Sequence, residues 1–502
     1  MTFNSKAIIQ DVRKDFEQML DYVTGETAQT ATADETERGL FKLLIQMGAK
    51  LLTLFFVMRS QSTSREPFQA SNGCVLRYHR DTERHYVSIF GKLCFARPYF
   101  YRPGQKGQSP LDAELSLGED CYSDLVREVS EYLGVNGVYH KSCDILERLL
   151  GLPLSTRVVA KNLSEDAVDV EAYYVQKAAP EVSTEAEILV IQADGKGVPM
   201  ILEEIPAGKV RLGKGEKHGR KKEAVVTCAY TIASSIRTPA QVTASIYEQV
   251  DRPTPPSQPQ NKHLWATLDG KEKALQRLSV QVASRQGKHI LHQQALCDGC
   301  EALQSRLQQQ FPDFTLVLDF IHANEYLWDV ANALLGETNE ERFEWMKTRT
   351  LQILSGQTEH LIGELRRIAN QPKCRLFLRT QLHKTANYFE RNLPYMDYPT
   401  YLSRGWPIAS GVIEGACRHF VKDRCELSGM RWLQTGAENL LRLRAVAENN
   451  DWDDYHAYRK QQRHHRLYAS LPISLETVEV QAFREPLLSN CQDTFHQLPL
   501  AA

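Results

Sequence analysis

The sequence predicts an α/β fold, and three patterns indicate it. Apolar residues recur at helical spacing over residues 5–24 and again from Glu325 to about Tyr401. Short continuous apolar runs of the kind that buried strands show occupy Ile188–Ile191 and Thr315–Leu318. Residues 74–101 carry further strand-like runs, which a Pro-Gly pair closes. The chain therefore combines helical regions with at least one buried sheet.

The composition is that of an ordinary globular protein. A chain of 502 residues is long enough for about two to four domains. Hydrophobic residues make up 42% and charged residues 24% of it, which is typical of soluble proteins. The formal net charge of -2 gives no support to nucleic-acid binding. It does not exclude it, because local patches neutralise phosphates.

The cysteines and the apolar segments predict a soluble cytoplasmic protein. The 11 cysteines do not have the spacing of a disulfide framework, and the single Cys297-x-x-Cys300 pair has no second pair. The N-terminus lacks the pattern of a signal peptide. The most apolar region, Leu40–Met58, is broken by lysines, and its uncharged part is too short to span a bilayer. Its helical spacing predicts a buried helix.

The N-terminal region is predicted to be mostly helical. Residues 5–24 form an amphipathic helix that Ser5 could cap. The polar stretch Thr27–Glu37 has no periodicity and is expected to be a linker. After the strand-like residues 74–101, helical spacing returns over residues 120–165.

Within residues 120–165 the pattern resembles a helix-turn-helix unit. Short helices are separated by turns that are expected to contain Gly134, Gly137 and Gly151. The last segment, Ser155–Asn162, carries its basic residues at Arg157 and Lys161. The second helix of such a unit can lie in a DNA major groove. A plain helical bundle is the alternative.

Three acidic residues are candidates for a metal site. Asp194 and Asp298 each follow a short apolar strand and precede a glycine, and Glu414 lies in the first turn of a helix that begins near Ser410. Ligands gather at strand ends in α/β sheets. Carboxylates suit Mg²⁺, and two such ions about 4 Å apart can clamp a phosphoryl transfer. A lone Asp-Gly is usually a turn, so the prediction depends on the three acids together.

Two long segments carry a resemblance to a known family. Residues 298–328, DGCEALQSRLQQQFPDFTLVLDFIHANEYLW, and residues 404–432, RGWPIASGVIEGACRHFVKDRCELSGMRW, surround the second and third acids. They resemble the Mutator-like group of prokaryotic insertion-sequence transposases, and within it the Kra-type insertion sequences. The first segment has the Asp-x-x-His element of that group, here Asp319 and His322. The resemblance extends over roughly residues 120–460.

The resemblance implies a fold and a set of site residues. It implies an RNase H-like catalytic core with an all-helical insertion, preceded by a mostly helical DNA-binding region with a small β element. Asp194, Asp298 and Glu414 would be the catalytic, metal-binding acids. Asp319 and His322 would support them, although Asp319 as the second acid remains an alternative.

The resemblance also implies an activity with its cofactors and partners. Two Mg²⁺ ions, with Mn²⁺ as a substitute, would serve DNA cleavage and then strand transfer. The partners would be double-stranded DNA with terminal inverted repeats, target DNA and further copies of the chain in a homodimer or larger assembly. No membrane partner is expected, and the protein would be cytoplasmic and associated with the nucleoid.

Several basic and aromatic residues are candidate DNA contacts. Glu414, Arg418 and Lys422 are spaced to share one helix face, so that Arg418 would support the site and Lys422 would contact phosphate. Residues 459–466 form one basic segment. The other is expected to bind the DNA backbone through Lys209, Arg211, Lys214, Lys217, Arg220, Lys221 and Lys222. Solvated surface is the alternative for both. Base stacking is a less favoured role than core packing for Trp406, Trp432 and Tyr326.

These interpretations divide the chain into seven parts. The expected parts are 1–65 (helical), 66–115 (β-rich), 116–180 (helix-turn-helix-like), 181–323 (first part of the core), 324–403 (helical insertion), 404–468 (last part of the core) and 469–502 (tail). An RNase H-like nuclease or resolvase without strand transfer is an alternative function. An inactive transposase derivative that only binds DNA is another. A transcription factor would leave most of the chain unexplained.

Overall fold

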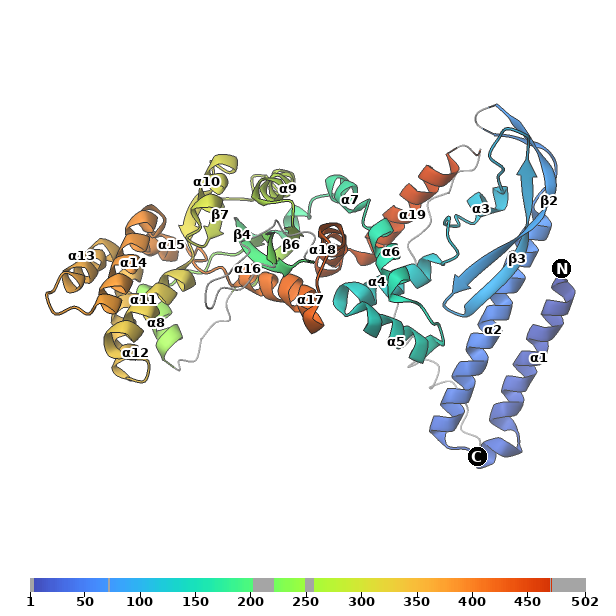
Figure 1. Cartoon of the computed structure of the whole chain (residues 1–502), viewed down its shortest axis with the longest axis horizontal. Coiled ribbons are helices and arrows are strands. Elements are labelled where there is room, and N and C mark those ends of the chain that lie inside the picture. The colour runs from blue at the N-terminus through green and yellow to red at the C-terminus, as the bar shows by residue number, and fades with distance from the viewer. Residues whose placement is uncertain (1–3, 71–72, 202–220, 249–256, 470, 472–502) are drawn as a thin grey trace, which may run out of the picture. The chain divides into compact units, whose positions relative to one another are not determined.

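A computed structural model describes residues 4–70, 73–201, 221–248, 257–469 and 471. Its helices and strands form a mixed α/β protein, shown in Figure 1. The chain divides into two compact units, of which unit 1 comprises Met1–Tyr173 with Asn450–Ala502, and unit 2 comprises Tyr174–Asn449. This division differs from the expected one, because residues 450–468 belong to unit 1 and not to the part that carries Glu414.

Unit 1 is mostly helical and contains a small antiparallel sheet in the order β1-β2-β3. Its strands are β1 (Phe68–Gln69), β2 (Val75–Ser88) and β3 (Gly91–Tyr101). Its helices are α1 (Ser5–Thr24), α2 (Ala33–Ser62), α3 (Pro110–Glu114), α4 (Asp124–Asn136), α5 (Tyr139–Leu150), α6 (Thr156–Asp166) and α19 (Trp452–Tyr468), while α7 (Val170–Gln176) contains the boundary. The predicted strands within residues 74–101 are confirmed as the β2–β3 hairpin.

The first two helices are confirmed, but their ends differ from the prediction. Asn4, and not Ser5, caps α1, because its side chain accepts a hydrogen bond from the Lys6 amide. The expected linker Thr27–Glu37 is wrong in its second half. Thr32 and Glu35 form a reciprocal capping box that starts α2 at Ala33. Local side-chain hydrogen bonds thus begin a helix where apolar periodicity is absent.

The prediction that residues 40–58 form a buried helix is wrong about burial. Phe41, Leu44 and Leu51 on α2 are exposed, and so are Phe55 and Met58. The helix packs against α1 and β3, which cover only part of its circumference. Among the described residues, α2 is the one helix long and apolar enough to cross a bilayer. A single helix of this kind near the N-terminus is weak evidence of a membrane span.

Helices α4, α5 and α6 pack on one another as the helical pattern predicts. Gly151 ends α5 in the left-handed conformation, with φ of 63°, and Ser155 caps α6 through the Val158 amide. Gly134 lies inside α4, not in a turn, and a Cβ there would approach Val159 within 3.2 Å. This close approach of α4 and α6 explains the small residue.

A buried ion-pair network joins α19 to α4 and α6. Arg459 is only 1% exposed and binds Asp124 at 2.8 Å and Asp166 at 2.9 Å. Asp124 also accepts from Arg463. Burial alone would raise the pKa of Asp124, but the two guanidinium groups hold it below its usual range. Arg466 in turn pairs with Asp169. The three arginines of the basic segment 459–466, namely Arg459, Arg463 and Arg466, therefore form ion pairs within the protein in place of the expected phosphate contacts.

Unit 2 contains a five-stranded mixed sheet in the order β6-β5-β4-β7-β8. Strand β4 pairs antiparallel with β5 and parallel with β7, β5 pairs antiparallel with β6, and β7 pairs parallel with β8. The strands are β4 (Ile188–Pro199), β5 (Lys221–Ile232), β6 (Gln260–Thr267), β7 (His292–Cys297) and β8 (Thr315–Leu318). The first strand of the sheet therefore lies in its centre.

The helices of unit 2 include the predicted helical region that follows β8. The region from Glu325 to Tyr401 is helical as predicted, and it belongs to α11–α15, on the left in Figure 1. The helices are α8 (Pro239–Tyr247), α9 (Lys271–Ser284), α10 (Glu301–Gln310), α11 (Phe320–Leu335), α12 (Glu341–Leu354), α13 (Thr358–Ala369), α14 (Leu376–Asn392), α15 (Tyr398–Ser403), α16 (Gly411–Ala416), α17 (Asp423–Cys425) and α18 (Gln434–Glu448). A π-helical turn, Cys417–Lys422, connects α16 to α17.

The two faces of the sheet are covered by different helices. Leu189, Ile191 and Ala193 of β4 point into a core that α9 and α10 complete. Because side chains alternate along a strand, Gln192 and Asp194 point to the opposite face, where α16 and the π-helical turn contact β4. The sequence analysis did not identify β6, whose residues become buried only in its second half.

The buried arginine of unit 1 generates a stability prediction. Replacing Arg459 with alanine removes one of the two arginines that pair with Asp124 and with the buried Asp166, leaving Arg463 and Arg127 as their remaining cations, which is expected to cost about 3 kcal/mol, the lower end for a broken buried pair. Hydrogen exchange of the α4 and α19 amides measures this loss in unit 1. The control is Lys161→Ala, whose exposed ion pair with Glu165 is worth a few tenths of a kcal/mol. Equal exchange in both variants would contradict the network's structural role.

Candidate functional site

Two of the predicted acids lie side by side at the ends of neighbouring parallel strands. Ala193 of β4 is in register with Cys297 of β7, and Asp194 and Asp298 are the next residues of each chain segment. Both side chains are half-buried. Strand alternation directs them to the face that carries α16, away from the core under α9 and α10.

The prediction that Asp194 closes its strand is only partly right. The parallel pairing with β7 ends there, but β4 continues to Pro199 in its hairpin with β5. Gly195 and Gly197 lie in this extension, where a Cβ would meet the side chains of Glu223 and Lys221. The glycines therefore make room for side chains of the neighbouring strand, and do not form a turn after the acid.

Both acids retain few hydrogen bonds. Asp194 accepts from its neighbouring Gly195 amide at 2.6 Å and from the Cys417 thiol at 3.3 Å. Asp298 accepts from the Cys300 amide at 3.1 Å, just before α10 begins. Burial, with the negative charge of Asp194, raises the pKa of Cys417. The thiol therefore stays protonated and donates a hydrogen bond to Asp194.

The segment that carries the third acid is fixed to the strand ends by three hydrogen bonds. Gln294 of β7 donates to the Pro407 carbonyl, and the Phe320 amide donates to the Ile408 carbonyl at 2.8 Å. The Ile413 amide then donates to Gln192 Oε1 at 2.9 Å. Gln192 is fully buried in the central strand. Its amide thus holds the first turn of α16, and with it Glu414, over the sheet.

Asp319 stands at the centre of a second group of side chains. It caps α11 through the Ile321 amide, and His322 Nδ1 lies 2.7 Å from its Oδ2. Ser410 binds it with both its amide and its hydroxyl. The same hydroxyl lies 3.3 Å from Glu414 Oε1. Ser410 therefore connects the Asp-x-x-His element to the third acid.

The pKa values in this group follow from these contacts. The hydrogen bond that His322 donates to Asp319 is the main cause that raises the pKa of His322 to about 9, against the opposing effect of burial. Burial would raise the pKa of Asp319, but its hydrogen bonds from His322 and Ser410 lower it. Burial and then the charge of Asp319 raise the pKa of Glu414. At neutral pH His322 and Asp319 therefore form an ion pair.

One compact set of ligand atoms in this group could hold a metal ion. Within the part of the chain that the structure describes, it consists of Asp319, His322 and Glu414, whose ligand atoms all lie within 4.8 Å of one another. Asp194 and Asp298 are not members of so compact a set. Glu414 thus faces Asp319 and His322, although Cys417 is within electrostatic range of both Glu414 and Asp194.

The remaining predicted site residues are distributed as follows. Arg418 and Lys422 are both exposed residues of the π-helical turn. Arg418 lies 3.9 Å from Asp423. Lys221 pairs with Glu426, and Lys222 donates to Gln434. On α6, the exposed residues include Arg157 and Lys161. The expected contacts that lie outside the described residues are Lys209, Arg211, Lys214, Lys217 and Arg220.

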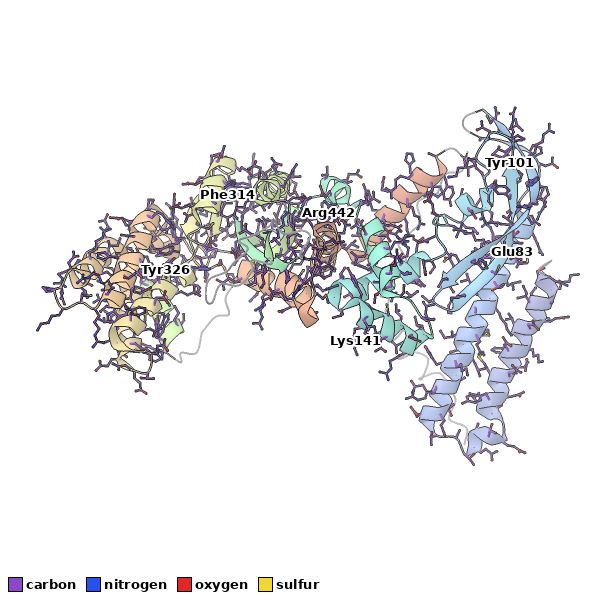
Figure 2. All side chains as sticks on the ribbon, viewed as in Figure 1. Glu83, Tyr101, Lys141, Phe314, Tyr326 and Arg442 are labelled. Atoms are coloured by element: carbon purple, nitrogen blue, oxygen red, sulfur yellow. The ribbon has the colours of Figure 1, made fainter. Side chains whose placement is uncertain are left out.

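Core packing is confirmed as the role of two of the three aromatic candidates. Trp406 and Trp432 are 3% and 7% exposed. Tyr326, labelled in Figure 2, stacks on Tyr388 with ring centroids 3.8 Å apart, and Lys384 lies over the Tyr326 ring. Neighbouring side chains therefore already engage this ring.

The sequence interpretation missed three residues that position the acids, namely Gln192, Ser410 and Cys417. A signal for Gln192 was available, because a polar amide inside a continuous apolar strand must find a partner. Ser410 and Cys417 flank Glu414 at four residues before and three after, which is one helical turn in each direction. Their contacts with Asp319 and Asp194 depend on the tertiary fold.

Comparison of the chain with protein-family models found no match, and a search of curated proteins found no relative.

The His322–Asp319 pair generates a pH prediction. Since the folded pKa of about 9 lies above the usual 6.5, the charge contributes fully below about pH 6.5 and is lost as pH rises through 9. His322→Asn keeps a neutral donor but removes the charge. It is expected to lower the free energy of unfolding by about 1.5–3 kcal/mol at pH 6, with the difference shrinking towards pH 10. Urea unfolding across this pH range measures it, and a difference independent of pH would point to packing instead.

Proposed function

We propose that the protein is a metal-dependent DNA transposase whose catalytic acids are Asp194, Asp298 and Glu414. The observation that carries the proposal is the convergence of these three residues from distant parts of the sequence. Asp194 and Asp298 each directly follow the last parallel pair of β4 and β7, and Gln192 holds the helix of Glu414 over the same end of the sheet. Such a gathering of carboxylates is the donor set that Mg²⁺ prefers.

The topology of the sheet supports an RNase H-like core as part of this proposal. The antiparallel strands β4, β5 and β6 come first in the sequence. Strands β7 and β8 are then added in parallel on the other side of β4, which becomes the central strand of the five. The helices α11–α15 interrupt this core between the second and third acids, as the resemblance implies for the insertion. The first and second acids of such a core would occupy the positions of Asp194 and Asp298.

The acids fit a pair of magnesium ions by their chemistry. Bound there, the ions would activate the attacking oxygen and stabilise the leaving one in DNA cleavage and strand transfer. Asp194 and Asp298 have oxygens that only nearby amides and thiols contact. The Glu414 side chain is 41% exposed, lies 3.3 Å from the Ser410 hydroxyl and 3.9 Å from His322, and would join the other two acids by a change of rotamer.

Asp319 and His322 would act as positioning residues in this mechanism. The Asp319 carboxylate accepts hydrogen bonds at both oxygens, and a protonated His322 has no lone pair to offer a metal. The pair holds Ser410, which in turn contacts Glu414. This arrangement favours Asp298 over Asp319 as the second acid.

The DNA partners belong to the same proposal. Exposed Arg157 and Lys161 on α6 suit a recognition helix that binds terminal inverted repeats. Lys422 is exposed on the π-helical turn that follows the helix of Glu414, and it suits a phosphate contact. The proposed role also includes assembly of a dimer or larger oligomer that holds two element ends together. This assembly would attack target DNA and would be associated with the nucleoid.

The acids generate the central prediction. Asp194→Asn, Asp298→Asn and Glu414→Gln are each expected to reduce Mg²⁺-dependent cleavage and joining of the element's ends by about 10³-fold or more, since each removes several kcal/mol of charge stabilisation. Asp319→Asn is the matched control and should retain measurable activity. If Asp319→Asn loses activity while Asp298→Asn keeps it, Asp319 replaces Asp298 as the second acid. Cleavage without joining would indicate a nuclease, and end binding without cleavage an inactive derivative.

Cys417 generates a second prediction within this function. Its thiol orients Asp194, so Cys417→Ala is expected to weaken Mn²⁺ binding by about 10–100-fold, as loss of an outer contact to a metal ligand typically does. Cys417→Ser restores a donor and should recover most of the affinity. Isothermal titration with Mn²⁺ measures both variants without depending on DNA cleavage. Equal affinity in the alanine and serine variants would exclude the orienting role.

A further inference from the structure

The helical insertion ends in an unusually cationic segment. From Arg366 to Phe389 the sequence contains six lysines and arginines and no acidic residue. In the structure this segment forms the end of α13, the connection to α14 and most of α14. Figure 1 shows α13 at the end of these helices that lies away from the sheet. Charge therefore accumulates at one end of unit 2.

Not all six cations are available to a partner. Arg366 pairs with Glu390, and Lys384 pairs with Asp329. Arg379 turns inward and donates to the Ala369 and Cys374 carbonyls, which fixes the connection to α14. The other three, Arg367, Lys373 and Arg375, are exposed, and none of them forms an ion pair with any residue that the structure describes. They surround a connection whose backbone is held in place.

Two apolar side chains directly follow the last of these cations, Arg375. Leu376 and Phe377, at the start of α14, are 78% and 75% exposed. Large apolar side chains at this exposure in a rigid element indicate an interaction surface. We name the surface formed by Arg367, Lys373, Arg375, Leu376 and Phe377 the basic tip. Cations with an adjacent apolar pair suit a nucleic acid, because the cations neutralise phosphates and the apolar pair can enter a groove.

Helix α14 connects the basic tip to the candidate active site. At its far end Arg391 donates to the Gly299 carbonyl at 2.6 Å, directly after Asp298. The 14 residues from Phe377 to Arg391 rise roughly 21 Å at 1.5 Å each. A duplex advances about 3.4 Å per base pair, so the separation corresponds to about six base pairs.

We propose that the basic tip binds the phosphate backbone and groove of duplex DNA about six base pairs from the phosphate that the acids would cleave. This inference rests on the proposed function for its point of reference, but the DNA contact itself does not. Helix α14 would set the distance between the two contacts.

Salt dependence of DNA binding tests the contact directly. The full-length triple variant Arg367→Ala/Lys373→Ala/Arg375→Ala should bind generic duplex DNA with a slope of log affinity against log salt that is shallower by about 2–3. Lys6→Ala/Arg13→Ala/Lys14→Ala removes the same charge from exposed positions of α1 and should keep the slope. Phe377→Ala should weaken binding about tenfold with the slope unchanged. Circular dichroism confirms folding.

Disulfide trapping tests the distance. Cys374, partly exposed at the tip, should cross-link to duplexes that carry a thiol-tethered base, with the highest yield about six base pairs from the cleavage position. Cys374→Ser should abolish this cross-link.

The outcomes separate this inference from the proposed function. If the wild type cleaves DNA but the triple variant keeps the slope, the basic tip is not a DNA contact. If the wild type never cleaves but the slope falls, the tip contact is supported and the transposase proposal fails. If the tip variants lose binding to vesicles of anionic lipid while DNA binding is unchanged, the inference is overturned in favour of a membrane surface. Strong trapping only at distant positions overturns the six-base-pair spacing.

Discussion

The parallel pairing of β4 with β7 in the middle of the sheet is the constraint on which the candidate site depends. Because side chains alternate with a period of two, a slip of one residue would turn Asp298 to the opposite face, into the core under α9 and α10. Parallel neighbours also require a long connection, which β5, β6 and α9 supply. The two acids can therefore be distant in sequence and adjacent in space.

Buried polar groups at the strand ends determine where the third acid lies. Gln192, Gln294 and Asp319 are fully buried, and each would cost about 1–3 kcal/mol if it lacked a partner. The segment from Pro407 to Ile413 supplies a hydrogen-bond partner to each of the three. Because Phe320 at the start of the insertion also binds Ile408 after it, the two ends of the insertion meet. A large helical insertion can thus leave the sheet undisturbed.

The sequence was sufficient where one physical signal dominated. Amphipathic spacing located α1 and the insertion, and continuous apolar runs located β4 and β8. It was insufficient where local signals conflict with tertiary ones. Strand β6 begins with exposed polar residues and becomes buried only at Leu264, so it lacks a uniform apolar run.

Charge was the least predictable property, because a basic residue has the same letter in a buried network and on a surface. The basic segment around Arg459 was expected to contact phosphate. Arg459 instead forms ion pairs with Asp124 of α4 and Asp166 of α6. The segment around Lys373 was overlooked, although its lack of acidic residues is visible in the sequence. The contact between Ser410 and Asp319 joins residues far apart in the chain, which no local pattern encodes.

The four carboxylates at the sheet edge differ in how completely their charges are compensated. Asp319 is fully buried and accepts from an imidazolium, a hydroxyl and two amides, so its charge is already balanced. Asp194 and Asp298 receive only neutral donors. Glu414 is half-exposed, and burial together with the charge of Asp319 raises its pKa. The charge of Asp319 is therefore balanced within the fold, whereas the charges of Asp194, Asp298 and Glu414 are only partly compensated by the residues that contact them.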